Sequence, residues 1–575
     1  MELIVTNEAR CRDCYRCIRA CPVKAIRIST GDESGEMYAR VIEEVCVQDA
    51  RCVSACPQQA KKVASSLAEV KNLIQKGTPL AAGVAPSFAA GLPLDEPRLM
   101  PALLRKLGFA RVQETSVGAE LVVGEHCRMG FDKPFISSAC PVVVNLIERH
   151  YPALLPLLAP VVSPMIAHGR YMKKVYPGHK TVFIGPCAAK KKEAGTPGID
   201  DAIDWVLGFD ELWEWAREEG VDPAGLTPVD FDGPQPGPAR LFPLEGGMFK
   251  SIGASFRKDH EFESVTGLDN CIEFLKHLSR DQSLPPGLVE MLACRGGCVN
   301  GPLVPCGHMD VFTRRRKVMD YHNAAAAGSG FDRASAVELP ASLLRREFVN
   351  RQLNFPMPGE QEIKNILAKT GKLQPEDEWN CGACGYDSCR DKAVAVYQGL
   401  AELEMCIPYM RQRAESMSNL VLAAMPNAVI IVDYDLVIKE VNPAMQKMFD
   451  CADREMVGQR LDRFMPPGGF AAVISSGEMI NRVSTYPGMD LTVGEIIFPL
   501  ENEKIIVGIL VDITAERRQR EQFELVKGQT IARAQEVITK QMTVAQEIAG
   551  LLGETTAETK VLLSKLIELM QKEPL

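Results

Sequence analysis

Two hydrophobic patterns alternate through the first half of the chain. Short apolar runs that are typical of buried strands, such as 181–185, are followed by runs of helical spacing, such as 142–150. This alternation between about residues 81 and 346 predicts an α/β domain in which functional loops follow the strands. Before it, apolar residues at helical spacing in 65–76 predict a helix that links this domain to an N-terminal module.

The C-terminal part of the chain has a different pattern. Apolar strands are expected at 429–433 and 507–511, and Asn442-Pro443 between them suits the start of a helix. From residue 516 onward, apolar residues recur three or four positions apart between charged ones. That stripe predicts a long helix, which either pairs with a second copy of the chain or packs as an ordinary core helix.

Length and charge narrow the class of protein. The chain has 575 residues, enough for several domains with cores of their own. Its net charge of −9 provides no basic surface of the kind that binds nucleic acid. Residues 1–7 lack the features of a secretory signal, and the apolar run 153–167 is too short and too rich in proline to span a membrane. We therefore expect a cytoplasmic protein without membrane or nucleic-acid partners.

Nineteen cysteines at metal-type spacings predict metal sites rather than disulfides. The run at 11–22, Cys-x2-Cys-x2-Cys-x3-Cys-Pro, is that of bacterial ferredoxins, in which the fourth cysteine binds the other cluster. A second run at 46–57 repeats this spacing with an aspartate in the second position. The two runs predict a ferredoxin-like module with two [4Fe-4S] clusters. Their ligands are Cys11, Cys14, Cys17 and Cys56 for the first cluster, and Cys21, Cys46, Asp49 and Cys52 for the second.

Asp49 distinguishes the second cluster from the first. A carboxylate is a harder ligand than a thiolate and leaves its iron labile. Asp49 is therefore either the fourth ligand of a [4Fe-4S] cluster or a non-ligand beside a [3Fe-4S] cluster. A degenerate site without a cluster is the weaker interpretation, because Cys21, Cys46 and Cys52 keep the ligand spacing.

Another group of cysteines lies in residues 381–406. Its members are Cys381, Cys384, Cys389 and Cys406. The run 394–405 predicts one helix that returns the last cysteine to the other three. Four thiolates also suit a zinc ion, but the iron–sulfur context favours a third [4Fe-4S] cluster. The group resembles the small single-cubane domain of corrinoid proteins in acetyl-CoA metabolism.

Three further loops carry cysteines beside proline or glycine. These loops are Ser137-Ser-Ala-Cys-Pro141, Gly185-Pro-Cys-Ala-Ala-Lys-Lys-Lys-Glu193 and Ala293-Cys-Arg-Gly-Gly-Cys298. Thiolates are soft ligands suited to iron, and glycine lets the backbone approach an inorganic core. Buried, inert thiols are the alternative interpretation. In this order, however, the loops resemble the three cysteine signatures of the iron-only ([FeFe]) hydrogenases.

That resemblance implies an H-cluster, which is a [4Fe-4S] cubane joined to a two-iron centre carrying CO, CN⁻ and a dithiolate. The cubane would be held by Cys140, Cys187, Cys294 and Cys298. Cys298 would also bridge to the two-iron centre. Lys190 matches the family lysine that bonds a cyanide ligand, and Glu193 matches the glutamate of the same loop. Ala85-Pro86-Ser87 is similar to the loop that lines the far side of the two-iron site.

Departures from the family pattern concern proton transfer. Catalytic members carry a proton-relay cysteine just before the first cubane ligand, where this chain has Ala139, which has no transferable proton. The family's relay glutamates follow a segment similar to Gly118-Ala-Glu-Leu121, which here leads into Glu125 and His126. His126 could carry a proton, although a lone histidine is more often structural. A retained active centre without the fast proton path resembles the sensory branch of the family.

Residues 416–515 resemble a PAS sensor domain in the order of their strands and helix. No haem-ligating or flavin-reactive residue can be assigned there, so we expect it to transmit a signal or to dimerise. The expected fold class is multi-domain α/β and α+β. The expected domains are a two-cluster ferredoxin-type domain at 1–64, an α/β H-cluster domain at 78–350, a four-cysteine [4Fe-4S] domain at 360–412, a PAS domain at 416–515 and a helical dimerisation tail at 516–575.

The sequence thus predicts a sensory [FeFe] hydrogenase, an oxidoreductase of low turnover that splits H2 heterolytically and passes a redox signal to its PAS and helical regions. Expected partners are H2 and protons, a ferredoxin-like electron carrier, a separate kinase or phosphatase, hydrogenase maturation proteins and a second copy of the chain. One alternative is a catalytic hydrogenase that evolves or oxidises H2 with ferredoxin. Another is a non-catalytic iron–sulfur electron-transfer or assembly protein. Lys190 argues against the latter, because a bare cubane has no use for a cyanide partner.

Overall fold

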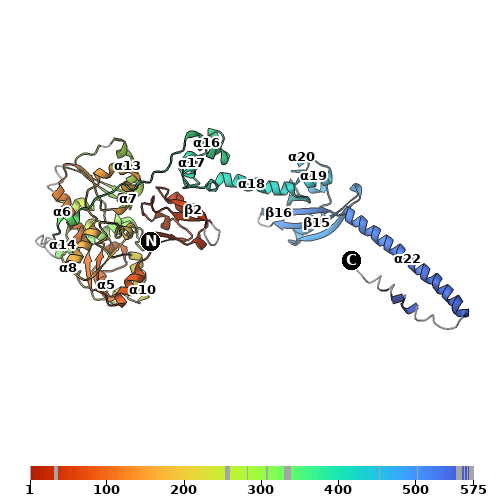
Figure 1. The fold of residues 1–575 in the computed structure, drawn as a ribbon, viewed down its shortest axis with the longest axis horizontal. Helices are drawn as coiled ribbons and strands as arrows, with labels where there is room; N and C mark the ends of the chain where they lie inside the picture. Colours follow the sequence, from red (N-terminus) through yellow and green to blue (C-terminus); the bar gives the residue numbers. More distant parts are fainter. Residues whose placement is uncertain are drawn as a thin grey trace. The chain divides into compact units, whose positions relative to one another are not determined.

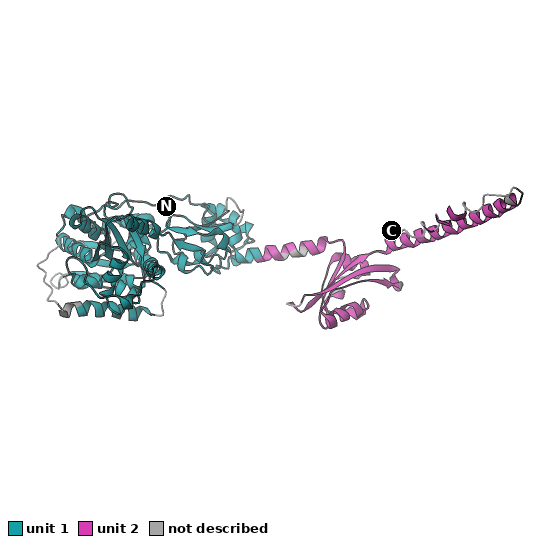
Figure 2. Ribbon diagram, turned by 90° about the horizontal axis from the view of Figure 1, so that it is seen from below, with its two compact units in different colours: residues 1–410 teal, residues 411–575 magenta. Residues whose placement is uncertain are grey.

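The computed structural model describes residues 2–30, 37–252, 260–281, 283–305, 309–328, 338–451, 453–500, 503–551, 560–562, 564, 565 and 568. The chain folds as two compact units, Met1–Met410 and Arg411–Leu575, which Figure 2 shows in different colours. Much of the expected C-terminal helix beyond residue 551 lies outside the described residues.

The N-terminal module, residues 2–64, consists of two antiparallel strand pairs and two short helices. Its elements are β1 (Ile4–Thr6) paired with β4 (Lys61–Val63), β2 (Ile26–Thr30) paired with β3 (Met37–Val41), α1 (Arg16–Ala20) and α2 (Arg51–Ser54). A module of this size has little apolar surface to bury, so small domains of this kind depend on metal sites or disulfides. Cys17, Cys21, Cys46 and Cys52 are accordingly part of its core.

The central domain, residues 78–350, contains two parallel sheets. The larger sheet has the order β6 (Arg111–Glu114), β5 (Leu80–Val84), β8 (Lys180–Gly185) and β9 (Trp205–Gly208). The smaller sheet has the order β10 (Glu261–Thr266), β11 (Gly287–Leu292) and β7 (Pro134–Ile136). β5 and β11 are buried along their whole length, as their nearly continuous apolar sequences require. The expected α/β architecture is confirmed, but its division between two sheets has no signature in the sequence pattern.

Helices surround these sheets (Figure 1). The longer ones are α3 (Leu67–Gln75), α5 (Leu99–Lys106), α6 (Ser116–Met129), α7 (Pro141–His150), α8 (Pro164–Val175), α10 (Phe209–Glu218), α13 (Leu268–Asp281) and α14 (Val311–Gly328). α3 and α7 confirm the helices expected at 65–76 and 142–150. α6 packs directly on α8 because Gly118 has no side chain, and a Cβ there would lie 2.2 Å from the Pro164 carbonyl oxygen.

The four-cysteine segment, residues 360–406, contains α16 (Glu360–Lys369) and α17 (Cys389–Tyr397). The single helix expected at 394–405 is wrong. Gly399 ends α17 by adopting φ +71°, and its N–H donates to the Val396 carbonyl. A separate 3-10 turn, Leu403–Met405, then leads to Cys406.

This segment packs against the N-terminal module, and Figure 1 shows α17 beside β2. Arg19 Nη1 donates to the Ala383 carbonyl oxygen at 2.8 Å. Gly385 lies so close to the same residue that a Cβ on it would be 3.1 Å from Arg19 N. Tyr386 and Ala395 join the apolar core of the module. The cysteine groups of the two segments therefore belong to one packed structure.

The second unit contains a five-stranded antiparallel sheet with short helices. The sheet order is β13 (Ile438–Val441), β12 (Ala428–Asp433), β16 (Ile505–Asp512), β15 (Leu491–Leu500) and β14 (Ile480–Tyr486), and the helices are α19 (Pro443–Phe449), α20 (Asp453–Met456) and α21 (Gly468–Ser476). The strands expected at 429–433 and 507–511 are confirmed. So is the helix start, because Asn442 Oδ1 accepts from Met445 N at 3.0 Å.

Long helices flank this sheet in the sequence. α18 (Ile407–Ala424) precedes it, and α22 (Thr514–Leu551) follows it. α22 confirms the predicted helix, and it exposes apolar side chains including Phe523, Leu525 and Ile548. Its pairing with a second copy of the chain stays a prediction. Within the described residues, no helix combines the length and the apolar character needed to cross a membrane.

The Asn442 side chain ties strand, helix and preceding segment together. It is 3% exposed, accepts from Val429 N at 2.8 Å, and donates to the carbonyls of Leu422 and Asn427 at 3.1 and 2.9 Å. We expect Asn442→Ala to lower the opening free energy of β12 and β16 by about 2–4 kcal/mol, because it removes a helix cap and leaves buried polar groups unpaired. Hydrogen exchange of these strands measures the change.

Asn481, an exposed residue of β14, provides the control. Asn481→Ala should leave the exchange of β12 and β16 within about 0.5 kcal/mol of the unmodified protein. Equal protection in the Asn442 and Asn481 variants would contradict the role given to the Asn442 side chain.

Candidate functional site

The cysteine loops of the central domain meet at the carboxyl ends of strands from both sheets. In the larger sheet, Cys187 follows β8 and Ala85-Pro86-Ser87 follows β5. In the smaller sheet, Cys140 follows β7 and Cys294 follows β11. Parallel strands end at one edge, where open α/β sheets place their binding sites. These four loop positions and Cys298 all line one cavity.

This apolar cavity holds about 800 Å3 of empty space, part of which is open to solvent. Its walls include Met165, Phe183, Phe242 and Leu292. Among the described residues that line it, Lys190 is the only ionisable side chain besides the thiols. A concave apolar site with a few convergent polar groups is typical of a cofactor site.

Three of the four thiols are disfavoured as anions by their surroundings. Burial, followed by the proximity of the other thiols, raises the pKa of Cys294 and of Cys298 well above the ordinary value for cysteine. The same causes raise the pKa of Cys187 to about 11. A positively charged inorganic core among them would reverse this effect, because a coordinating thiol loses its proton. The donor chemistry therefore fits an iron–sulfur cubane.

Buried hydroxyl groups add a polar side to the apolar cavity. Ser87 Oγ and Thr115 Oγ1 line it, and neither has a hydrogen-bond partner among the described residues. Each unsatisfied buried hydroxyl costs roughly 1–3 kcal/mol. An occupant that offers hydrogen-bond acceptors would remove that cost.

Lys190 reaches the apolar cavity from α9 (Ala189–Glu193). Its Nζ lies 3.0 Å from Glu193 Oε2 and 3.2 Å from Ser163 Oγ. Burial lowers the pKa of the Lys190 ammonium, but the nearby Glu193 carboxylate and Cys187 thiol together raise it by a larger amount. The pKa of Lys190 is therefore above its ordinary value. Lys190 is therefore a cation, and it faces a site where anionic ligands would be stabilised.

Ala139 presents a methyl group to the apolar cavity at the position expected for a proton relay. His126 does not replace the missing relay group, because it is not among the described residues that line the apolar cavity. It is buried, its Nδ1 donates to the Val122 carbonyl at 2.8 Å, and burial lowers its pKa to about 4. Glu125 is paired with Arg345 at 2.7 Å. His126 is thus the neutral, structural residue that the simpler interpretation expects.

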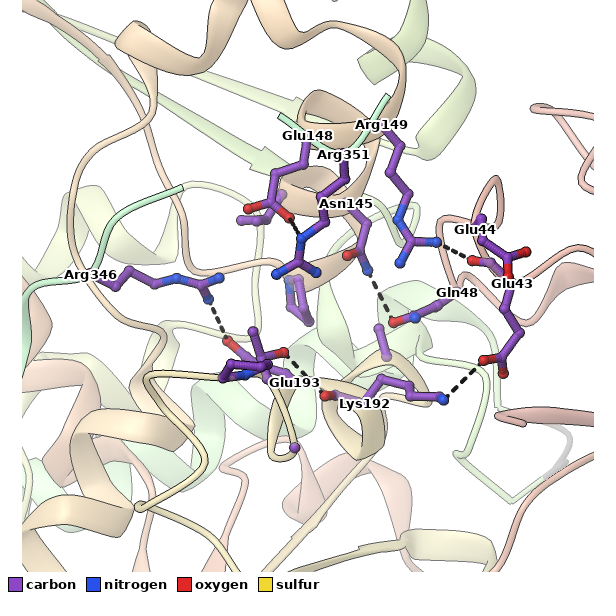
Figure 3. A pocket seen from close by; sticks show the side chains of 16 residues that line it. Glu43, Glu44, Gln48, Asn145, Glu148, Arg149, Lys192, Glu193, Arg346 and Arg351 are labelled. Atoms are coloured by element: carbon purple, nitrogen blue, oxygen red, sulfur yellow. Dashed lines mark hydrogen bonds and ion pairs between the residues drawn. The ribbon is translucent and has the colours of Figure 1, made fainter. Parts of the chain in front are cut away.

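A second, polar cavity of about 840 Å3 lies on the other side of α9. Figure 3 shows charged side chains from several segments pointing into it. It is lined by residues of the N-terminal module such as Glu43, of α7 such as Glu148 and Arg149, and of the segment that carries Arg346. Glu193 lines this polar cavity, whereas Lys190 lines the apolar one. The sequence did not predict the polar cavity, because the segments that line it are far apart in the chain and no local spacing connects them.

The N-terminal module gathers the expected ligands of the second cluster. Burial, and then the proximity of Cys46, Asp49 and Cys21, raises the pKa of Cys52 well above its ordinary value. Burial also raises the pKa of Asp49 to about 6. Asp49 Oδ2 lies 3.5 Å from Arg51 Nε without forming a hydrogen bond to any described residue. Such an unsatisfied buried oxygen fits a ligand position.

The expected ligands of the first cluster are more accessible. Burial raises the pKa of Cys17 to about 11, and nearby Cys11 and Cys14 contribute to the rise. Cys14 itself is exposed, and Cys56 is partly buried with its Sγ accepting from Ala60 N at 3.3 Å.

The four-cysteine segment places lysines beside its thiols. Lys372 Nζ donates to Cys406 Sγ at 3.4 Å, and the charge of buried Lys392 acts on Cys384, Cys389 and Cys406. Cys381, the remaining member, is exposed. In the part of the chain that the structure describes, no three His, Cys, Asp or Glu side chains are arranged to hold a single metal ion.

Tyr386 connects this segment electrostatically with the N-terminal module. Its ring belongs to the core of the module, and its hydroxyl has no hydrogen-bond partner among the described residues. Burial, then the proximity of Cys384 and Cys21, raises the pKa of Tyr386 above its ordinary value. One expected ligand of the second cluster, Cys21, and one of the third, Cys384, are therefore both close to Tyr386.

Four protein-family models match parts of this chain. Residues 78–302 match the C-terminal domain of the iron only hydrogenase large subunit, and residues 10–60 match a 4Fe-4S dicluster domain. Residues 378–408 match a family model for an Fe-S cluster, which supports iron rather than zinc at that site. Residues 422–478 match the PAS fold.

Curated relatives include hydrogenases and an assembly factor. The NADP-reducing hydrogenase subunit HndD of Solidesulfovibrio fructosivorans is 26% identical over 361 residues, which cover 52% of this chain and 57% of HndD. Iron hydrogenase 1 of Clostridium pasteurianum is 26% identical over 368 residues, which cover 52% of this chain and 64% of that protein. The cytosolic Fe-S cluster assembly factor NAR1 of Yarrowia lipolytica is 25% identical over 195 residues, covering 30% of this chain and 40% of NAR1. The chain thus spans about three fifths of the two hydrogenases.

One solved structure that matches part of this chain is a variant of the [FeFe]-hydrogenase HydA1 from Chlamydomonas reinhardtii. It has a TM-score of 0.40 and 18% sequence identity, and the match covers 50% of this chain and all of HydA1. The assignment of the central domain rests on the family model and on the cavity that its four cysteines line. Residues 78–302 of this chain are an iron only hydrogenase large-subunit domain, joined in one chain to a 4Fe-4S dicluster domain and a PAS fold.

Proposed function

We propose that this protein is a hydrogen sensor of low turnover. H2 would be split slowly and heterolytically at an H-cluster in the apolar cavity, and the redox change would pass through the iron–sulfur clusters toward the PAS domain. The observation that carries this proposal is the methyl group of Ala139 on the cavity wall, beside four cysteines and Lys190. The site keeps the groups that would hold an active centre and lacks the side chain that would serve it with protons.

Each residue of the apolar cavity has a defined task in this proposal. Cys140, Cys187, Cys294 and Cys298 would hold the cubane, and Cys298 would also bridge to the two-iron centre. When bound, the H-cluster supplies an iron site at which H2 is cleaved and a cubane that accepts electrons. Lys190 would bond a cyanide ligand through its ammonium, and Pro86 and Ser87 would close the opposite wall. The apolar residues around them would exclude bulk water.

The low rate follows from the chemistry of heterolytic cleavage. Each event releases a proton, and a positioned acid–base group speeds such a transfer by about 10²–10⁴-fold. Ala139 supplies no such group, and the buried neutral His126 does not line the apolar cavity. A sensor gains from this, because the centre stays in its hydrogen-altered state for longer.

The arrangement of thiols supports an electron route out of the H-cluster. Asp49 is close enough to Cys294 for its charge to raise the pKa of that thiol, which supports a second cluster near the cubane. Tyr386 is close enough to Cys384 and Cys21 for both thiols to raise its pKa, which supports proximity of the second and third clusters. The last ligand of the third cluster, Cys406, directly precedes α18, the helix that continues into the second unit. A redox change would thereby reach the start of a helix that leads to the PAS domain.

Several partners follow from this proposal. The proposed output is a separate kinase or phosphatase, with dimerisation through α22 as the means of transmission. Maturation proteins would install the two-iron centre, and the protein would work in the cytoplasm. The fusion of domains motivates these links, which is an associational argument.

A catalytic hydrogenase is the second candidate, and similarity to HndD and iron hydrogenase 1 favours it. It requires fast proton transfer despite Ala139. An assembly role like that in the name of NAR1 is less favoured, because the apolar cavity and Lys190 have no use around a bare cubane.

Restoring the relay thiol separates the sensor from the catalytic hydrogenase. In matured protein, we expect Ala139→Cys to raise H2 turnover by roughly 10–100-fold, because a thiol can carry the proton that a methyl group cannot. Steady-state H2 oxidation with an artificial electron acceptor measures the rate. Ala139→Val, which fills space without a proton, should not raise it. Unchanged turnover in the cysteine variant would favour the catalytic hydrogenase.

Infrared spectroscopy tests the H-cluster itself. Matured protein should show bands of iron-bound CO and CN⁻ that shift when argon is replaced by H2. Lys190→Gln should shift the CN⁻ bands, because it removes the cationic hydrogen-bond donor from the apolar cavity. Lys191→Gln is the matched control, since Lys191 pairs with Glu211 at 2.7 Å and does not line the cavity. An absence of bands after full maturation would rule out both hydrogen functions.

The third cluster should depend on Lys372. A hydrogen bond and a positive charge on Cys406 Sγ stabilise the reduced cluster. We therefore expect Lys372→Gln to make its midpoint potential more negative in a redox titration followed by electron paramagnetic resonance. Lys369→Gln, an exposed residue of α16, should leave the potential unchanged. Equal potentials in all three proteins would remove Lys372 from the electron route.

A further inference from the structure

One ion pair lies in the wall between the apolar cavity and the polar cavity. Lys190 lines the apolar cavity, Glu193 lines the polar one, and Nζ and Oε2 lie 3.0 Å apart. Pro141 lines both cavities, so their walls adjoin here. A hydrogen-bonded pair of ionisable groups therefore spans the wall, one group on each side.

Among the described residues that line the apolar cavity, Lys190 is the only such group with an onward hydrogen bond to another ionisable side chain. Apart from thiols that would be bound to iron, the other described polar groups in the lining are the hydroxyls of Ser87 and Thr115. Neither hydroxyl has a hydrogen-bond partner among the described residues, so neither continues toward solvent. A proton released in the apolar cavity thus has one continuous route through described side chains, and that route begins at Nζ.

On the polar side, Glu193 has an unsatisfied acceptor. It is 5% exposed, and its Oε1 has no hydrogen-bond partner among the described residues. Arg346 Nη1 lies 3.8 Å from that oxygen, which is beyond hydrogen-bond distance, and Figure 3 shows the two side chains facing each other. The polar cavity has room for several waters. Glu193 Oε1 is buried in its wall, so such a water bonds to this oxygen once the carboxyl turns toward the cavity.

We propose that Lys190 and Glu193 form a substitute proton path, from the apolar cavity into water of the polar cavity, that sets the residual rate of this protein. The inference rests on the proposed splitting of H2. Lys190 Nζ gives a proton to Glu193 Oε2, and the resulting amine takes up the proton released in the apolar cavity. The Glu193 carboxyl then gives its proton to water. One proton crosses the wall, and both side chains end as they began.

The same contacts explain why such a path is slow. The first transfer neutralises an ion pair that burial strengthens, so it runs uphill. Arg346 adds a positive charge next to the carboxylate, which disfavours its protonation. The path therefore supports slow turnover without matching a relay thiol.

The test measures exchange between H2 and D2O by mass spectrometry in matured, full-length protein. Gln cannot accept a proton but keeps the size of Glu, so Glu193→Gln should lower the exchange rate by at least about 10-fold. Glu148→Gln is the matched control, because Glu148 is a buried carboxylate of the same polar cavity that pairs with Arg351 at 3.4 Å. It should leave the rate unchanged. Unchanged exchange in Glu193→Gln would overturn the path.

A second variant predicts the opposite effect. Arg346→Gln removes the charge that disfavours protonation of Glu193, so exchange should rise severalfold. A purely structural role of Glu193 in holding Lys190 predicts no such rise. It predicts instead that Glu193→Gln shifts the infrared CN⁻ bands as Lys190→Gln does. Shifted bands, or no rise in Arg346→Gln, would overturn the proton path.

A double variant separates this inference from the proposed function. Once Ala139→Cys supplies a relay thiol, Glu193→Gln should have little further effect on exchange. If Ala139→Cys raises the rate but Glu193→Gln never lowers it, the path fails and the proposed sensor stands. If Ala139→Cys has no effect while Glu193→Gln abolishes exchange, the path stands and the account of the sensor's low rate fails.

Discussion

Four thiols that line one apolar cavity are the constraint on which the central domain depends. Burial disfavours the thiolates of Cys187, Cys294 and Cys298, and the neighbouring thiols disfavour them further. Only a positively charged core between them makes the set stable as anions. The fold meets this need by ending strands of two parallel sheets around one cavity, so that Cys187 comes from one sheet and Cys140, Cys294 and Cys298 from the other. The packing of the two sheets therefore also forms the cavity that would hold the cofactor.

The cavity keeps charge and water at a distance, and this shapes its chemistry. A dry site strengthens the interaction of Lys190 with anionic ligands, because the local dielectric constant is low. The same dryness leaves few routes for protons. Ala139 removes one route, and the ion pair of Lys190 with Glu193 is the one connection that the described side chains offer toward the polar cavity. In the proposed function, slow proton movement and a retained active centre would thus have a common physical origin.

The N-terminal module and the four-cysteine segment are packed together. The N-terminal module is too small to be stable without its thiols in the core, and the four-cysteine segment packs on that module through Arg19 and Tyr386. Metal binding and domain packing support each other in such an arrangement. The helix α18 starts directly after Cys406, so a cluster bound there would adjoin a helix rather than a loop.

The sequence by itself determined what local spacing can encode. It indicated the cysteine runs, the alanine at position 139, the helix beginning at Asn442-Pro443 and the strands that precede the ligand loops, because each depends on a few neighbouring residues. It erred where one residue overrides a pattern, as when Gly399 ends the helix expected at 394–405. The division into two sheets, the packing of Tyr386 near Cys21 and the polar cavity were decided only by the tertiary structure. Glu43, Arg149 and Arg346 meet there from three distant segments, and contacts over such separations follow from how the chain packs rather than from any spacing along it.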